Sequence, residues 1–88
     1  MASRTATVGS AVGLHARPAS IIAEAAEAFE EEILLSLEGS DDEGVDAASS
    51  LMIMTLGAEK GARVVVESEN SEAVDAIAAL VDRDLDAD

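Results

Sequence analysis

The chain has 88 residues, 49% of them hydrophobic, and a formal net charge of −14 from 19 acidic and five basic side chains. A chain of this length forms a single domain over residues 1–88, with one hydrophobic core. The absence of cysteine excludes disulfides and thiolate metal sites. A surface with this excess of acidic side chains repels nucleic-acid phosphates and anionic lipid heads. We therefore expect no binding to nucleic acid. No apolar run of signal-peptide or membrane-spanning length is present, and we expect a cytoplasmic protein without membrane insertion.

The acidic excess also bears on stability. Like charges on one surface repel each other, and salt screens that repulsion. Lys60 is the only lysine, and many of the apolar side chains are small. This composition resembles that of proteins from salt-loving microbes. An ordinary acidic domain is the alternative.

The first half of the chain alternates between strand and helix patterns. Residues 3–8 alternate in polarity, which predicts an edge or half-buried strand, and residues 9–14 form a loop. Pro18 suits the first turn of a helix, where its missing N–H has no cost. Apolar residues then recur at helical spacing over 19–29, and residues 33–37 read as a second strand.

The middle of the chain contains a turn, a short strand and a short helix. Residues 38–44 are rich in glycine and acid, which predicts a solvated turn. Residues 45–47 form a short third strand. Ser49 or Ser50 caps a brief helix over 51–54 that ends at a glycine.

The last part of the chain adds a strand and a helix. Residues 63–67 form a β-branched strand with alternate residues facing inward. Asn70 or Ser71 caps the last helix, and residues 82–88 form a charged tail. The buried stripe of that helix consists of Val74, Ile77, Ala78 and Val81.

The element order is therefore β-α-β-β-α-β-α. This order predicts an α+β fold, an open-faced β-sandwich in which a four-stranded antiparallel sheet carries three helices on one face. No repeat or linker interrupts it.

The single histidine, His15, lies just before the predicted helix start, with Arg17 two residues later. An imidazole is a competent nucleophile near neutral pH. The N–H groups at a helix start favour an anion, and an arginine can donate a planar fork of N–H groups to phosphoryl oxygens. This arrangement can bind a dianion without a metal. A lone exposed histidine near an arginine usually has no special role, which is the alternative interpretation.

The segment Gly-Leu-His-Ala-Arg-Pro-Ala at residues 13–19 resembles the active-site signature of HPr, the histidine-containing phosphocarrier of the sugar phosphotransferase system. Ser49, residues 51–57 and Gly61 are also similar to that family. The resemblance covers essentially the whole chain, and it implies the open-faced sandwich as the fold.

The resemblance implies specific roles for the residues of the signature. The Nδ1 atom of His15 would accept a phosphoryl group from phosphorylated enzyme I and donate it to the sugar-specific enzyme IIA component. Arg17 would contact the phosphoryl group, and the backbone N–H groups of Ala16 and Arg17 would stabilise it. No metal or other cofactor is implied, and nothing demands more than a monomer. Ser49 matches a serine that a regulatory kinase phosphorylates in some relatives, although a plain N-cap is the favoured interpretation because Ala48 and Ser50 depart from the family pattern.

Partner docking would involve an apolar patch of Ile21, Leu51 and Met54 beside the His15 loop, with core packing as the alternative for some of them. The acidic Glu24 and Glu27, at positions that are often lysine in relatives, predict a partner with basic residues or binding in high salt.

Three other functions compete with a phosphocarrier of sugar transport. The first is a non-catalytic acidic regulatory or binding module of the same fold, which the intact His15 and Arg17 disfavour. The second is a carrier that serves a dihydroxyacetone kinase or a nitrogen-regulating branch. The third is a small hydrolase with His15 as general base, which ranks last because no Ser or Cys nucleophile with an orienting acid accompanies it.

Overall fold

The computed structural model describes residues 2–40 and 44–83, and within them the helices and strands follow the predicted order. The elements are β1 (Ala2–Thr7), α1 (Ala16–Glu27), β2 (Ile33–Leu37), β3 (Val45–Asp46), α2 (Ser50–Thr55), β4 (Arg63–Ser68) and α3 (Ser71–Asp82). The predicted turn at 41–43 and the tail at 84–88 lie outside the described residues. No helix in the described part is long and apolar enough to cross a membrane.

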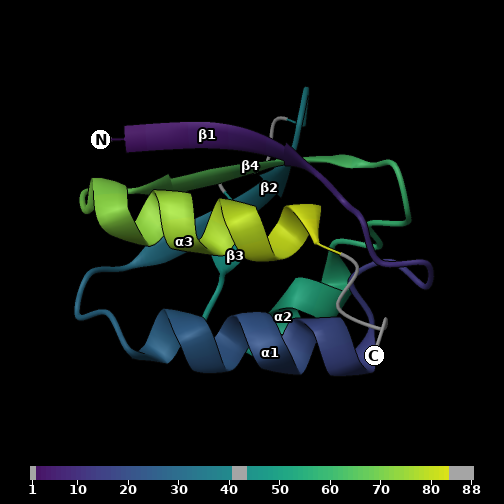
Figure 1. The fold of residues 1–88 in the computed structure, drawn as a ribbon, viewed down its shortest axis with the longest axis horizontal. Coiled ribbons are helices and arrows are strands. Elements are labelled where there is room, and N and C mark those ends of the chain that lie inside the picture. Colours follow the sequence, from purple (N-terminus) through teal and green to yellow (C-terminus); the bar gives the residue numbers. More distant parts are fainter. Residues whose placement is uncertain (1, 41–43, 84–88) are drawn as a thin grey trace.

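The four strands form one antiparallel sheet in the order β1-β4-β2-β3. The last strand of the chain is therefore central, and β1 and β3 are the edges, as expected for β1. The three helices cover one face of this sheet, and the other face is open (Figure 1). The α+β open-faced sandwich is thereby confirmed.

The core lies between the sheet and the helices. Alternate residues of the strands point toward it, so Val64 and Val66 of β4 are fully buried, as is Leu35, which faces Val66 across the ladder. The stripe of α3 is buried as predicted. Asn70 is its N-cap, and the side-chain oxygen of Asn70 accepts from the first-turn N–H groups at 3.0 and 3.4 Å.

Helix α1 begins before its apolar pattern does. The spacing of apolar residues places the helix over 19–29, whereas the structure places it at Ala16–Glu27. The start lies earlier because His15 takes the N-cap position, and the exposed Ala16 and Arg17 add a half-turn that apolar spacing cannot reveal. At the other end, Ala28 is the C-cap, and its N–H donates to the carbonyl of Ala25 at 3.2 Å.

Helix α2 is short and packs through one fully buried side chain, Ile53. Ser49 is its N-cap, because its hydroxyl oxygen accepts from the N–H of Met52 at 3.3 Å. Gly57, in the left-handed region at φ +65°, follows the helix end as expected. Strand β3 is one residue shorter than predicted and ends before the buried Ala47, whose N–H still donates to the carbonyl of Ile33.

Candidate functional site

His15 lies at the start of α1 with its side chain exposed. Its backbone is extended, at φ −94° and ψ −160°, and its carbonyl accepts the first helical hydrogen bond, from the N–H of Ala19 at 2.8 Å. The imidazole makes no capping hydrogen bond to the helix. The ring is therefore accessible to a reacting partner.

The start of α1 is suited to an anion. The N–H groups of Ala16 and Arg17 precede the first helical hydrogen bond, and Pro18 has no N–H to contribute. The first turn carries no acidic side chain, so the positive end of the helix dipole is not neutralised by a carboxylate of the same turn. Arg17 adds an exposed guanidinium there. The structure thus brings three predicted residues, His15, Ala16 and Arg17, to one helix end.

The two residues before His15 hold the loop against the rest of the fold. Leu14 is 2% exposed, and its N–H donates to the carbonyl of Ala58 at 2.9 Å. Gly13 has φ +78°, and a Cβ added to it would lie 2.4 Å from the carbonyl oxygen of Ala58. Both the backbone angle and the close approach require glycine at this position. The Gly-Leu pair is therefore explained by the packing of the loop.

The predicted docking residues lie on two helices that pack side by side, α1 and α2 (Figure 1). Leu51 is 73% exposed, whereas Ile21 is half-buried and Met54 packs partly against the core. The structure adds two exposed apolar side chains that sequence reasoning missed, Val12 at 53% and Met52 at 44%. Met52 could have been found, because a short helix that buries Ile53 must turn the preceding residue outward.

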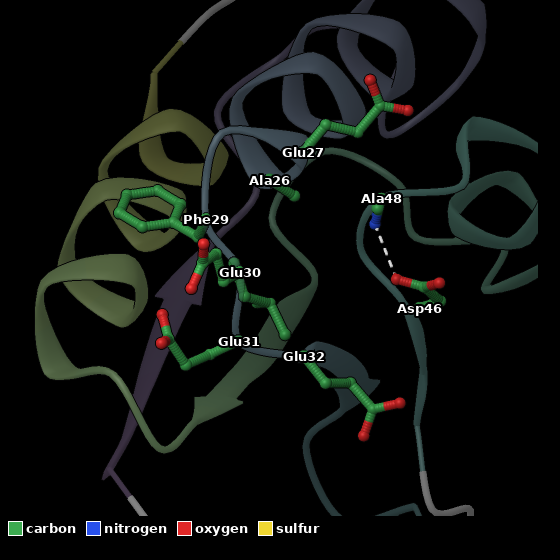
Figure 2. Close-up of a pocket in the computed structure, with 9 residues that line it drawn as sticks. Ala26, Glu27, Phe29, Glu30, Glu31, Glu32, Asp46 and Ala48 are labelled. Atoms are coloured by element: carbon green, nitrogen blue, oxygen red, sulfur yellow. Dashed lines mark hydrogen bonds between the residues drawn. The ribbon is translucent and has the colours of Figure 1, made fainter.

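A hollow of about 250 Å³ lies at the opposite end of α1, away from His15 (Figure 2). Its walls carry the carboxylates of Glu27, Glu30, Glu31, Glu32 and Asp46. The carboxylates of Glu27, Glu31 and Glu32 point in different directions, and that of Asp46 accepts from the N–H of Ala48 at 2.9 Å. No group of three or more potential ligands within residues 2–40 and 44–83 could hold a metal ion.

An open-faced sandwich with an exposed histidine at the start of its first helix defines a class of protein, the histidine phosphocarriers. A family model described as the PTS HPr component phosphorylation site matches residues 2–83. The chain is also similar to the phosphocarrier protein HPr of Streptomyces coelicolor, with 44% identity over 69 residues, which covers 78% of this chain and 72% of the relative. The chain therefore belongs to the HPr family, whose members are phosphocarriers of the phosphotransferase system.

Solved structures agree with this assignment. The HPr of Bacillus anthracis is 30% identical, with a TM-score of 0.80, over 91% of this chain and 95% of that one. A Thermoanaerobacter tengcongensis protein described as HPr-C-His is 32% identical, also with a TM-score of 0.80, over 92% and 91% of the two chains. Phosphocarrier function in a phosphotransferase system follows from the family, and the competing functions considered from the sequence are not favoured.

Proposed function

We propose that His15 is the residue that carries the phosphoryl group. The observation that supports this is its place at the start of α1, exposed and beside N–H groups that precede the helical hydrogen bonds. The imidazole Nδ1 attacks the phosphorus of phosphorylated enzyme I, and the new N–P bond forms as the bond from phosphorus to the donor breaks. In the second transfer a nucleophile of the enzyme IIA component attacks the phosphorus, and the N–P bond to His15 breaks as the new bond forms.

Arg17 and the backbone of Ala16 and Arg17 stabilise the transferred group in this proposal. The guanidinium offers two parallel N–H donors to phosphoryl oxygens, which a lysine cannot do. Because these donors belong to a helix already packed on the core, little reorganisation is needed when charge develops. Catalysis is then positioning and charge neutralisation shared between two proteins.

The partners of the carrier dock around this helix start. Enzyme I and the enzyme IIA component would contact the exposed Leu51 together with Ile21 and Met54, on the two adjacent helices. A small apolar patch with a charged rim suits transient docking. The rim includes the exposed carboxylates of Glu24 and Glu27, so the partners carry matching basic residues or bind in high salt.

We also propose that the protein acts as a cytoplasmic monomer adapted to high salt. Its net charge of −14 is the observation that supports the salt adaptation.

For Ser49 we favour a structural role as the N-cap of α2 over a role as a regulatory phosphorylation site. Its hydroxyl oxygen accepts from the N–H of Met52 and so caps α2.

The phosphoryl carrier is tested by incubation with phosphoenolpyruvate and the cognate enzyme I in high salt, followed by intact-mass measurement. The expected result is a gain of one acid-labile phosphoryl group that is absent in His15→Ala. Ser49→Ala is the matched control and should gain the same group. An unchanged mass of the wild type, with enzyme I shown to be active, would refute the proposal.

The role of Arg17 is tested by comparing Arg17→Lys with Arg17→Ala. Lysine retains the charge and loses the fork, so we expect Arg17→Lys to transfer faster than Arg17→Ala and slower than the wild type. Rates equal to the wild type in both variants would remove Arg17 from the mechanism.

A further inference from the structure

The loop that leads to His15 lies directly on the end of α3. The N–H of Gly9 donates to the carbonyl of Val81 at 3.0 Å, and the hydroxyl of Ser10 donates to the carbonyl of Arg83 at 3.5 Å. The last carbonyls of a helix have no acceptor role inside the helix, so they are available to hold a neighbouring segment. We call residues 8–14 the His15 loop.

Gly9 permits an approach that no other residue allows. A Cβ added to Gly9 would lie 2.1 Å from the carbonyl oxygen of Asp82, 2.9 Å from its carbonyl carbon and 3.0 Å from that of Arg83. All three atoms belong to the backbone, which cannot yield as the end of a flexible side chain could. The glycine is therefore required by space at this position.

Ser10 connects this contact to the reacting residue. It is fully buried, and its carbonyl accepts from the N–H of Gly13 at 2.9 Å, which closes a tight turn. The next residue, Leu14, is fixed by its hydrogen bond to Ala58, and His15 follows. The backbone from the end of α3 to His15 is thus held at successive points by hydrogen bonds and one close contact.

The other side of the loop is held by the turn before β4. The N–H of Val8 donates to the carbonyl of Ala62 at 2.8 Å, and the carbonyl of Val8 accepts from the N–H of Gly61 at 2.9 Å. These bonds continue the sheet pairing of β1 with β4. They fix where the loop leaves the sheet, and the contact with α3 fixes the direction that it takes afterwards.

We propose that Gly9 and Ser10 are positioning residues for phosphoryl transfer, because they seat the His15 loop on the last turn of α3. This inference rests on the proposed role of His15. Ser10 is buried and the contact of Gly9 is with the backbone of α3, so neither residue touches the phosphoryl group. They act through the place and orientation of the imidazole. Their loss therefore lowers the maximal rate of transfer and leaves the affinity for enzyme I in place.

The expected size follows from the contact distance. The Cβ of Gly9→Ala must move by about 1 Å to reach an acceptable separation from the Asp82 carbonyl. A displacement of that size at a reacting group costs up to about 100-fold in rate, which is the upper bound for this variant because it assumes that the whole shift reaches His15. Ser10→Ala leaves the backbone path intact and removes one hydroxyl donor to α3. A smaller loss than for Gly9→Ala is expected for it.

The experiment measures transfer from phosphorylated enzyme I to the wild type, Gly9→Ala, Ser10→Ala and Gly39→Ala, at a temperature where circular dichroism shows each folded. Gly39 is the matched control, because it has φ +83° and an added Cβ would meet no atom within 4 Å. Gly39→Ala thus strains a turn without touching α3. We expect the kcat of transfer to fall in Gly9→Ala and Ser10→Ala, with no change in the KM of enzyme I for the variant. Both constants should stay at wild-type values in Gly39→Ala.

Each outcome decides the matter. A wild type that acquires no phosphoryl group on His15 refutes the proposed carrier residue. If the wild type is phosphorylated on His15 but kcat is unchanged in Gly9→Ala, only the positioning role is overturned. The same holds if Gly9→Ala changes KM alone, or if Gly39→Ala loses as much activity as Gly9→Ala. If Gly9→Ala does not fold, Ser10→Ala is judged by the same criteria.

Discussion

Raising the salt concentration should stabilise this protein strongly, because its net charge of −14 lies on a small surface. In the described part of the chain, the ion pairs Arg4–Asp75 and Arg63–Glu38 are both exposed. Pairs of this kind contribute little to the free energy of unfolding. Most of the acidic charge is therefore left to self-repulsion, which salt screens.

The magnitude follows from the size of the molecule. The folded chain has a radius of gyration of 11.1 Å. It therefore behaves as a charged sphere of about 14 Å radius, whereas the unfolded chain has a radius of gyration of roughly 30 Å. The Debye length falls from ~10 Å at 0.1 M salt to ~3 Å at 1 M, which removes far more repulsion from the compact state. Screened Coulomb energies then give a rise in the free energy of unfolding on the order of 5 kcal/mol between ~0.1 M and ~1 M salt.

The assay is urea unfolding, followed by circular dichroism, at several potassium chloride concentrations. Urea is uncharged and leaves the ionic strength to the salt. The control is a quadruple variant, with Glu30, Glu32, Glu67 and Glu69 each changed to glutamine, which takes the net charge from −14 to −10. None of these four side chains forms an ion pair or hydrogen bond within the described residues. Because the self-repulsion scales with the square of the charge, the gain from salt should fall to about half.

A flat response of the wild type to salt would refute the reasoning. So would equal slopes for the wild type and the quadruple variant, because that result would assign the salt effect to something other than charge repulsion.

Three further predictions concern stability, and urea unfolding in ~1 M salt checks each of them. Asn70→Ala should lower the free energy of unfolding by about 1–2 kcal/mol, since it removes an N-cap that accepts from two N–H groups. Asn70→Ser keeps an oxygen acceptor at the cap and loses only the exposed bond that the Asn70 amide donates to Glu31, so it should cost less; equal losses in both would contradict this. Ile53→Ala should lower the free energy of unfolding by about 2–5 kcal/mol and Leu51→Ala by far less, because only Ile53 is buried. The reverse order of losses would show that α2 packs differently. Arg4→Ala should cost less than ~1 kcal/mol, because the pair with Asp75 is exposed, and a larger loss would contradict this view.

Much of the fold could be predicted from local patterns. Alternation identified β1 and β4 and the inward side of Val64 and Val66, and helical spacing identified the buried stripe of α3. Both patterns are local, because side chains of a single helix or strand face the core at a fixed spacing along the chain. Apolar spacing alone does not mark the start of α1, because Ala16 and Arg17 are exposed and carry no apolar signal, whereas Pro18 indicated it. The order of strands, with β4 central, has no local signal at all.

The candidate site divides in the same way. His15, Ala16 and Arg17 are consecutive in the sequence, and Pro18 indicated a helix start beside them. The sequence alone therefore placed these three residues at one helix end. Only the tertiary structure showed that Val12 is exposed, that Leu14 is fixed to Ala58, and that the His15 loop rests on α3.

The sequence by itself therefore determined the chemistry available at the helix start and the order of the elements, since both depend on residues close together in the chain. The tertiary structure decided where that helix start is held. Gly9 and Asp82 are almost a whole chain apart, and no periodicity or motif records that their backbones touch. Their contact depends on the packing of α3 against β1, which arises only when the whole core is formed.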